Sequence, residues 1–404
     1  MKILQINSAL ITDAPGRIAE EIGKVVIANG HESYFGFGRA PRPITSTPVK
    51  IGSRFDQMIH LVLTRTIDRH GFGSIAATRE FIDKIKIIDP DIIHLHSLHG
   101  YYINIRVLFN YLKESNKPVV WTLHDCWPFT GHCSHYVTAN CYKWENFCHH
   151  CPKKKSYPAS WGLDNSTKNF YDKKAIFTSL SNLHFVSPSK WLAGEFKRSF
   201  LQQYPIQVIH NGIDLKQFHP EKKLDDAALI SRFENKPIIL GVASVWGNYK
   251  GLDDFVVLNE MLKDRATIVL VGLNEHELKR LPDSIIGIKR TENIDHLAAL
   301  YASASVFVNP TYADTFPTTN LEALASGTPV VTYRTGGSPE ALDENTGFVV
   351  ETGNIKALAS AISDVIISKS AAKRNNCRSR AEQHFNKELK YLDYLTLYNS
   401  LLNQ

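Results

Sequence analysis

Short apolar runs alternate with amphipathic helical patterns along the first half of the chain. The first apolar run is followed by a polar loop, and then by apolar residues from Ile18 to Val26 at the spacing of a helix. Buried strands are predicted over residues 2–7, 33–38, 91–96 and 119–124, and a short strand followed by a turn over residues 184–189. Because strands that alternate with helices form parallel sheets with helices on both faces, this half predicts a Rossmann-like α/β domain.

The second half repeats the alternation and ends in a helical tail. Its strands are predicted over residues 238–244, 267–272, 306–308 and 330–333. Residues 355–404 have helical spacing throughout. We place the domain boundary after residue 205, which gives an N-terminal domain of residues 1–205 and a C-terminal domain of residues 206–404.

The segment 306–340 combines several features that suit one ligand. A loop with Asp314 leads to a helix that starts near Thr318 and carries Glu322, and the turn Gly336-Gly337 is expected to open another helix. Helix N-termini present unpaired N–H groups, and glycines let a phosphate approach the backbone closely. The carboxylate of Glu322 can accept hydrogen bonds from two adjacent hydroxyls. A diphosphate next to a diol is the pattern of a nucleotide sugar.

Each of these features has a simpler interpretation when it is taken alone. An isolated Gly-Gly pair is usually only a loop, and a glutamate on a helix is usually only solvated. The whole run is more specific: Asp314, followed after seven further residues by Glu322 and then by the stretch up to Glu340, resembles the donor-site block of glycosyltransferase family 4. The enzymes of that family that it resembles are retaining and have the GT-B fold.

The resemblance implies a role for each residue of the donor site. Glu322 would hold the ribose hydroxyls and Asp314 would contact the donor sugar, although the family usually has a glutamate at the first position. Lys250, followed by Gly251, resembles the family's diphosphate-binding lysine, but the basic residue often found near it is replaced here by Tyr249. The other donor-binding residues implied by the run are Thr318, Thr319, Asn320, Gly336 and Gly337.

Polar residues also follow the predicted strands of the N-terminal domain. The strand at 119–124 ends in His124-Asp125, and its continuation as Cys-Trp-Pro-Phe-Thr-Gly looks like family-4 enzymes that build bacterial surface polysaccharides. That resemblance implies that His124 positions the donor sugar, whereas a His-Asp pair alone would more often be a turn. Candidate acceptor or cleft residues are Gly16, His96, His99 and Asp125. His94, inside its strand, is expected to be a core histidine.

Four cysteines lie in a cysteine-rich insert at about residues 126–155: Cys133, Cys141, Cys148 and Cys151. The Cys-x-x-Cys spacing of the last two is typical of tetrahedral zinc sites, so the four could hold one structural zinc ion. His132, His135, His149 or His150 could replace one ligand. Reduced core thiols and, outside the cytoplasm, disulfides remain alternatives. A nucleic-acid zinc module is disfavoured because the spacing is that of no recognisable finger.

The apolar runs and the charge of each half indicate where the protein is expected to act. No apolar run among the 404 residues is long enough to span a bilayer, and the N-terminus is predicted to be a strand rather than a signal peptide. We therefore expect a cytoplasmic protein. Residues 1–205 contain 25 Lys and Arg against 16 Asp and Glu, whereas the remainder contains 21 against 24. The basic half suits an anionic membrane surface, or has no specific partner; no nucleic acid is expected to bind.

We predict an α/β glycosyltransferase (a hexosyltransferase) of the GT-B fold, whose last helix crosses back to the N-terminal domain. The resemblance implies transfer of a sugar, with retention and without a catalytic cofactor, from a nucleotide diphosphate sugar to a hydroxyl of a glycan. That glycan would be lipid-linked, in exopolysaccharide, capsule or O-antigen synthesis. The alternatives are a nucleotide-sugar epimerase on the same fold and a non-enzymatic glycan- or nucleic-acid-binding protein.

Overall fold

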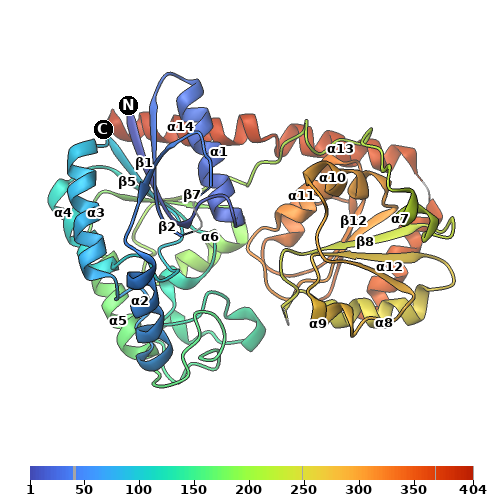
Figure 1. Ribbon diagram of the computed structural model, residues 1–404, viewed down its shortest axis with the longest axis horizontal. Helices are drawn as coiled ribbons and strands as arrows, with labels where there is room; N and C mark the ends of the chain where they lie inside the picture. Colours follow the sequence, from blue (N-terminus) through green and yellow to red (C-terminus); the bar gives the residue numbers. More distant parts are fainter. Residues whose placement is uncertain (40–41, 248, 369, 404) are drawn as a thin grey trace. The chain divides into compact units, whose positions relative to one another are not determined.

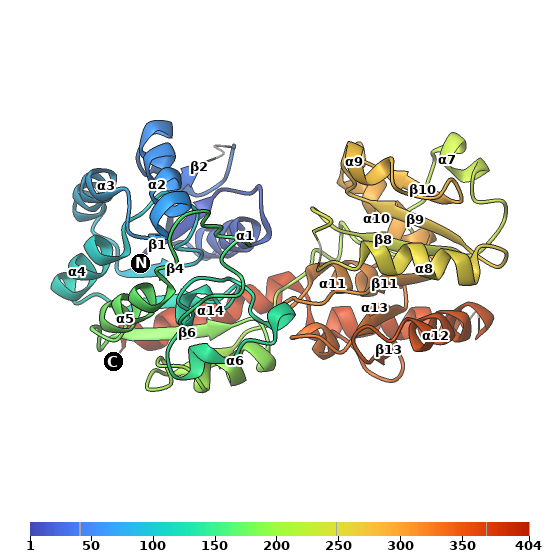
Figure 2. The ribbon, with the colours of Figure 1, turned by 90° about the horizontal axis from the view of Figure 1, so that it is seen from below.

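The chain forms two compact units in a computed structural model that describes residues 1–39, 42–247, 249–368 and 370–403. The first unit runs from Met1 to His210 and includes the C-terminal segment from Lys390, and the second runs from Asn211 to Leu389. Each unit is a parallel sheet with helices on both faces (Figure 1 and Figure 2). The prediction of an α/β protein with two Rossmann-like domains is confirmed.

The first sheet has the strand order β3-β2-β1-β4-β5-β6-β7, and its neighbouring strands are parallel. The strands are β1 (Lys2–Ala9), β2 (Glu32–Arg39), β3 (Thr47–Lys50), β4 (Ile92–Leu95), β5 (Val119–Thr122), β6 (Leu183–Ser187) and β7 (Ile206–Val208). The boundary predicted near residue 205 lies just before β7, the last strand of this sheet. Because β7 pairs with β6, and Ile209 still donates a hydrogen bond to the Ser187 carbonyl, the chain leaves the first sheet only after that point.

Helices cover the two faces of the first sheet in separate groups. They are α1 (Ala14–Ala28), α2 (Arg54–Ile67), α3 (Ile75–Ile88), α4 (Ile105–Ser115), α5 (Ser166–Phe177), α6 (Lys190–Lys197) and α14 (Lys387–Leu402). Successive side chains of a strand point to opposite faces. Leu4 and Ile6 therefore pack in the same cluster as residues of α3, α4 and α5, while Ile3 packs with residues of α1 and α14.

The last helix is fixed to the first sheet by buried tyrosines. Tyr391, Tyr394 and Tyr398 of α14 lie in one apolar cluster with strand residues. The Tyr398 hydroxyl and His94 Nδ1 are 2.6 Å apart, and the other ring nitrogen of His94 is 2.8 Å from the Thr122 hydroxyl. His94 is fully buried with both nitrogens hydrogen-bonded, which confirms it as a core histidine.

The second sheet has the strand order β10-β9-β8-β11-β12-β13. Its strands are β8 (Ile238–Val242), β9 (Thr267–Val271), β10 (Ile285–Ile288), β11 (Val306–Asn309), β12 (Val330–Tyr333) and β13 (Gly347–Val350). The helices are α7 (Ala227–Ser231), α8 (Leu252–Leu262), α9 (Glu275–Leu278), α10 (Ile294–Ser303), α11 (Thr318–Ala325), α12 (Ile355–Ser368) and α13 (Ala371–His384). Residues of α8 and α12 pack with one face of the sheet, and residues of α10, α11 and α13 pack with the other.

One expectation about local structure is wrong. The turn at Gly336-Gly337 opens a single 3₁₀ turn, Ser338–Ala341, rather than a helix, because the backbone is extended at Leu342 (φ −107°, ψ 162°), and β13 begins only at Gly347. The 14-residue α2 starts at a capping box in which Ser53 and Asp56 bond each other's backbone N–H groups.

The insert after β5 has little regular structure. Its described residues up to α5 contain three 3₁₀ turns, Trp127–Phe129, Val137–Ala139 and Lys143–Glu145, and neither an α-helix nor a strand. Among the described residues of the whole chain, no helix has both the length and the apolar character needed to cross a membrane.

Candidate active site

Two predicted site residues of the second unit meet where its strand order reverses. The chain passes from β8 out to β9 and β10 and then returns to β11 on the other side of β8. Ligands of open parallel sheets bind at the carboxyl ends of the strands beside such a reversal. Lys250 lies in the loop after β8, and Asp314 lies in the loop after β11. Sequence positions 64 residues apart are thus brought into contact.

Lys250 and Asp314 form an ion pair with 2.6 Å between Nζ and Oδ2. Burial alone would lower the pKa of Lys250, but the negative charge and hydrogen bond of Asp314 outweigh it and raise that pKa. The ammonium group is therefore charged at neutral pH. Gly251 follows with φ +74°, and a Cβ atom there would lie 2.3 Å from the Pro310 carbonyl oxygen. Only glycine allows the two loops to approach this closely.

Glu322 lies one turn inside α11 and is half-buried. The hydroxyl of Tyr301, a fully buried residue of α10, donates a hydrogen bond of 2.8 Å to Glu322 Oε2. This contact holds the carboxylate in one orientation. Thr318 and Thr319 form the start of the same helix and are partly exposed, and the N-cap residue, Pro317, makes no side-chain capping hydrogen bond.

Asn320 differs from its neighbours because its side chain faces the interior. It is fully buried, and its Oδ1 accepts a hydrogen bond of 2.8 Å from Asn309. Its Nδ2 donates to Ser338 Oγ at 2.9 Å. The amide therefore ties β11, α11 and the 3₁₀ turn together, and the structure gives Asn320 this internal role rather than a place at the surface of the site.

Gly336 and Gly337 lie in the turn after β12, the neighbour of β11. Gly336 has φ +54°, which is the left-handed region, and Gly337 has φ −85°. The Ser338 N–H donates to the Thr335 carbonyl at 3.0 Å, so the turn is closed by its own backbone. All these candidates other than the buried Asn320 therefore follow adjacent strands at one edge of the second sheet.

A hydrogen-bond chain in the first unit sets the tautomers of two histidines. Gln5 Nε2 donates to the Ala19 carbonyl at 2.7 Å, which leaves its Oε1 as the acceptor for His96 Nε2 at 3.1 Å. His96 Nδ1 must then accept from His124 Nε2, 3.0 Å away. Burial lowers the pKa of His96 well below its usual range and that of His124 to about 4, the latter opposed by Asp125. Both rings are neutral at pH 7, and Nδ1 of His124 is a hydrogen-bond acceptor.

His99 and Asp125 form a second pair at the ends of β4 and β5. His99 Nε2 lies 2.8 Å from Asp125 Oδ2, and its Nδ1 lies 2.9 Å from the Tyr157 hydroxyl. The other oxygen of Asp125 accepts from the Trp127 N–H at 2.9 Å. Burial would raise the pKa of Asp125, but the interaction with His99 outweighs it and the pKa is lowered. The result is a carboxylate that orients an imidazole.

Gly16 has a packing reason as well as a place at the site. It lies in the first turn of α1, and a Cβ atom there would be 1.6 Å from the Leu10 carbonyl oxygen. Asp13 caps this helix by accepting from the Gly16 N–H at 2.8 Å. Burial raises the pKa of Asp13, against the opposing charges of Arg39 and His99.

Three further residues at this edge are absent from the sequence-based predictions. Asp13 had a usable signal, because an Asp before a Pro-Gly pair at a helix start is typical of an N-cap. Tyr157 and Lys173 had none, since they reach the site from the insert and from α5. Lys173 Nζ is buried, donates to the Trp127 and Thr130 carbonyls at 2.6 and 2.8 Å, and lies 3.6 Å from the Trp127 ring centre. Burial lowers its pKa to about 7. It fixes the loop that follows Asp125.

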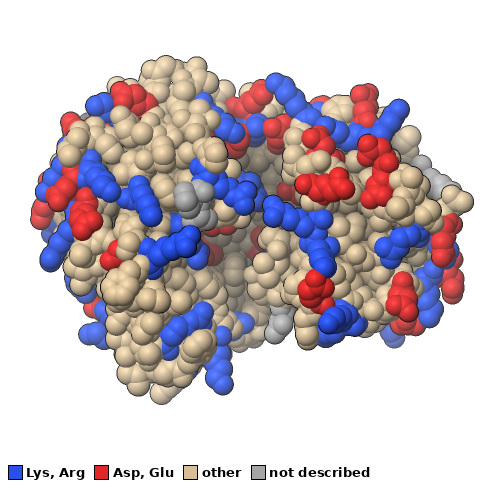
Figure 3. All heavy atoms as spheres, in the orientation of Figure 1, with Lys and Arg blue, Asp and Glu red and all other residues tan. Residues whose placement is uncertain are grey.

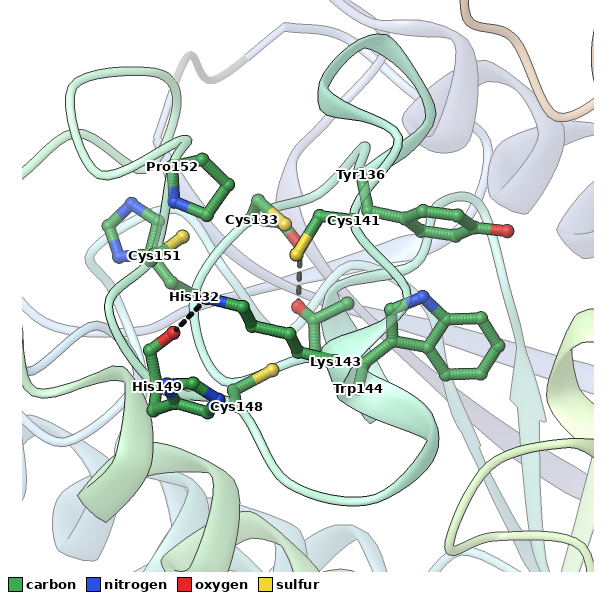
Figure 4. Close-up of a pocket in the computed structure, with 11 residues that line it drawn as sticks. His132, Cys133, Tyr136, Cys141, Lys143, Trp144, Cys148, His149, Cys151 and Pro152 are labelled. Carbon is green, nitrogen blue, oxygen red and sulfur yellow. Dashed lines mark hydrogen bonds between the residues drawn. The ribbon is translucent and has the colours of Figure 1, made fainter.

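The four cysteines of the insert line one pocket (Figure 4). All six cysteines of the chain are free thiols. Among the described residues, no three Cys, His, Asp or Glu side chains are already grouped as metal ligands.

Comparisons with known proteins identify the family. The model described as "Glycosyltransferase Family 4" matches residues 16–217, half of the chain, and the model described as "Glycosyl transferases group 1" matches residues 236–368. The fold, with two Rossmann-like units, is that of GT-B glycosyltransferases. The chain therefore belongs to glycosyltransferase family 4 and is an enzyme, which rules out the non-enzymatic alternative.

Two relatives match most or more than half of the chain. It is 26% identical over 372 residues to the putative colanic acid biosynthesis glycosyl transferase WcaC of Escherichia coli, covering 89% of each protein. It is 29% identical over 246 residues to the N,N'-diacetylbacillosaminyl-diphospho-undecaprenol alpha-1,3-N-acetylgalactosaminyltransferase of Campylobacter jejuni, covering 57% of this chain and 63% of that one.

Solved structures share the fold at low sequence identity. Sucrose-phosphate synthase from Thermosynechococcus elongatus has a TM-score of 0.74 and 18% identity, and covers 100% of this chain and 99% of its own. Anabaena Alr3699/HepE in complex with UDP-glucose has a TM-score of 0.68 and 15% identity, and covers 99% of this chain and 100% of its own.

Proposed function

We propose that this enzyme transfers a hexose from a nucleotide diphosphate sugar to a hydroxyl of a lipid-linked glycan in bacterial surface-polysaccharide synthesis. The observation that carries the proposal is the second unit's site, where Lys250, Asp314 and Glu322 lie beside the Gly336-Gly337 turn at one sheet edge. The named relative in colanic acid synthesis and the structural neighbour with UDP-glucose support it.

Each part of the donor has a matching group. The ribose diol would bind Glu322, whose carboxylate is already oriented by Tyr301. The diphosphate would bind Lys250 together with the backbone N–H groups near Gly336 and the open end of α11. The sugar would contact Asp314, the partner of Lys250.

Electrostatic stabilisation of the leaving group is the main catalytic effect in this proposal. As the bond from the anomeric carbon to the diphosphate breaks, negative charge builds up on the phosphate oxygen, and the charged Lys250 stabilises it. The acceptor hydroxyl attacks the anomeric carbon, and the leaving phosphate takes its proton. Attack on the face that the phosphate leaves retains the configuration. No metal or other cofactor takes part in these steps.

The first unit would bind the acceptor. Both ring nitrogens of His99 are paired, Nε2 with Asp125 and Nδ1 with the Tyr157 hydroxyl, so an acceptor hydroxyl would bind His99 by replacing Tyr157 at Nδ1. Asp13 and Arg39 add a carboxylate and a cation to the same polar region. The Campylobacter relative is named for an acceptor that carries diphospho-undecaprenol, and this supports a lipid diphosphate in the acceptor here.

A transfer assay tests the proposal. Thermal-shift measurements against a panel of nucleotide sugars would find the donor, and the stabilising compound would then be incubated with extracted lipid-linked glycans. We expect a radiolabelled sugar to move from the nucleotide sugar to the lipid fraction only when the enzyme and the lipid-linked glycan are both present. Release of free nucleotide and an epimerised sugar without an acceptor would instead show that the enzyme is a nucleotide-sugar epimerase. The absence of any nucleotide binding would refute the proposal.

A lipid-linked acceptor requires contact with the cytoplasmic face of a membrane, and α2 offers a surface for it. Four apolar residues of this helix follow the spacing i, i+3, i+4, i+7, and two more lie in the insert loop that hydrogen-bonds to its C-terminal end. This α2 patch consists of Phe55, Met58, Ile59, Val62, Trp161 and Leu163, whose side chains are 44–73% exposed. In its described residues, α2 buries only His60 and Thr64.

Basic groups surround the α2 patch. Arg65 lies with its guanidinium carbon 4.8 Å from the Trp161 ring centre, and Lys154 donates to the Gly162 carbonyl at 2.8 Å. The space-filling view of this side of the first unit has largely uncharged surface over α2 and the insert, with Lys and Arg beside it (Figure 3). An apolar patch with a basic rim suits an anionic lipid surface.

Vesicle co-sedimentation tests the membrane contact. We expect the enzyme to bind anionic vesicles and not neutral ones, and to dissociate at high salt because the basic contribution is screened. The double substitution Met58→Ser and Val62→Ser should weaken binding by at least about tenfold, since apolar area no longer enters the lipid. Ile367→Ser, which changes a residue 74% exposed in the second unit, is the matched control. Equal binding by both variants would refute this surface.

A further inference from the structure

The pocket of the insert is built from sulfur ligands that are distant in sequence. Cys133, Cys141, Cys148 and Cys151 all line it, and Figure 4 shows the four sulfur atoms around the same space. Cys133 is 7% exposed and the other three are half-buried, so the pocket is shielded yet reachable by a small ion. The thiols of Cys133 and Cys151 are hydrogen-bonded to each other.

Backbone groups are oriented toward these sulfur atoms. The Gly131 N–H donates to Cys148 Sγ at 3.1 Å, and the Lys153 backbone N–H donates to the sulfur of Cys151. Such donors stabilise a thiolate more than a thiol, because the negative charge strengthens the hydrogen bond.

A second histidine–carboxylate contact anchors the pocket wall. His132 precedes Cys133, and its Nδ1 is 2.6 Å from Asp68 Oδ1, with both side chains fully buried. Asp68 ends α2 and also accepts from the Asn165 N–H at 3.0 Å. The wall that carries Cys133 is thus joined to α2 and to the start of α5, which gives one ligand a rigid support.

A metal cross-link would add order to an insert that has little regular structure. Its described residues are held in three 3₁₀ turns, without a helix or strand, and its cysteines form no disulfide. Positive charge is also present, since Lys143 lines the pocket and its Nζ donates to the His149 carbonyl at 3.1 Å. A nearby ammonium offsets the net negative charge that four thiolates leave on a divalent cation.

We propose that Cys133, Cys141, Cys148 and Cys151 bind one structural zinc ion that fixes the insert and, through it, the loop after Asp125. Four thiolates and no open position are the ligand set of structural zinc sites. Since the four sulfur atoms are not yet grouped as ligands, binding requires rotation of thiols about their Cα–Cβ bonds within the pocket, with loss of four protons. This site is separate from the proposed transfer reaction and does not depend on it.

Metal analysis of the full chain tests the proposal. Protein purified without added zinc or chelator should contain about one equivalent of zinc, with four thiols that react with a thiol reagent only after chelation or unfolding. The double substitution Cys148→Ser and Cys151→Ser should lose the metal. Cys377→Ser, which alters a fully buried thiol of the second unit, should retain it.

If that double variant does not fold, experiments on the wild-type protein can still decide whether the site binds zinc. Chelation should lower its melting temperature by at least about 5 °C, and one equivalent of Zn²⁺ should restore it. Cobalt in place of zinc should give the visible absorption of a tetrahedral thiolate complex. Less than about a tenth of an equivalent of zinc, with no uptake by the reduced protein, would overturn the proposal. So would a native mass that shows disulfides among these cysteines.

Discussion

Substitution of Glu322 gives the sharpest test of the donor site. The carboxylate is held by the Tyr301 hydroxyl at 2.8 Å and is proposed to accept hydrogen bonds from the two ribose hydroxyls. We expect Glu322→Ala to remove both contacts and Glu322→Gln to keep one neutral acceptor. Tyr301→Phe is the matched control, because it removes the internal hydrogen bond and leaves the carboxylate in place.

The magnitude follows from the kind of bond that is lost. Hydrogen bonds to a charged group contribute about 1.5–3 kcal/mol each, so the loss of two corresponds to about 3–6 kcal/mol. Because 1.4 kcal/mol is a factor of ten, the dissociation constant of the nucleoside diphosphate should rise by roughly 10²- to 10⁴-fold in Glu322→Ala. The rise should be nearer tenfold in Glu322→Gln and only a few-fold in Tyr301→Phe.

Titration calorimetry with a nucleotide and with its 2′- or 3′-deoxy form completes the test. The wild-type enzyme should discriminate between the two ligands, and Glu322→Ala should bind both with the same weak affinity. Folding of each variant is checked by its melting temperature. If Glu322→Ala is folded and still discriminates between the nucleotides as the wild type does, the carboxylate does not bind the ribose, and the donor orientation proposed here is wrong.

Two further substitutions test the electrostatics of each unit. Lys250→Ala should lower turnover by roughly 10²- to 10³-fold while weakening nucleotide binding much less, because the charge matters most as the diphosphate leaves. Lys263→Ala, which alters an exposed lysine of the same unit, should do neither, and normal turnover in Lys250→Ala would contradict the assignment. The second test concerns His60, whose Nε2 accepts from the Gly71 and Gly73 N–H groups and whose pKa is lowered from 6.5 to about 3 by burial. The unfolded state binds this proton below pH 6.5 and the folded state does not, so the free energy of unfolding should fall by up to about 1.4 kcal/mol per pH unit from pH 6.5 toward pH 3. Urea unfolding at pH 7, 6 and 5 should show a shallower decline in His60→Asn than in the wild type, and parallel declines would refute the neutral histidine.

The strands that sequence reasoning found are those in the middle of the sheets. Central strands such as β1 and β9 are buried on both faces, and their Ile, Leu and Val residues are easily recognised in the sequence. The strands that it missed or assigned to the wrong domain are the four edges: β3, β7, β10 and β13. These edge strands have only three or four residues each, and each is partly or mostly exposed. The mostly exposed β3 has no apolar pattern at all.

For the candidate site, too, some residues could be predicted from the sequence and others could not. Residues within a local motif, such as Lys250 before Gly251 or Glu322 on its helix, have fixed spacing and could be predicted. Their partners could not, because Tyr301, Gln5 and Lys173 reach the site from other elements, and a single sequence does not reveal which distant side chains meet. Asn320 was predicted to bind the donor because of its place in the motif, but the motif does not reveal that its amide faces the interior.

In the proposed reaction, the pairing of Lys250 with Asp314 bears on how the enzyme distinguishes substrate from transition state. Lys250 is already neutralised by Asp314, so a bound diphosphate must share or replace that partner and gains little from the exchange in the ground state. The balance changes as the bond to the sugar breaks, because the phosphate oxygen then acquires additional negative charge while Asp314 keeps its own. A lysine held charged but occupied therefore favours the state in which the leaving group is most negative. This is the differential stabilisation that raises turnover rather than merely tightening binding.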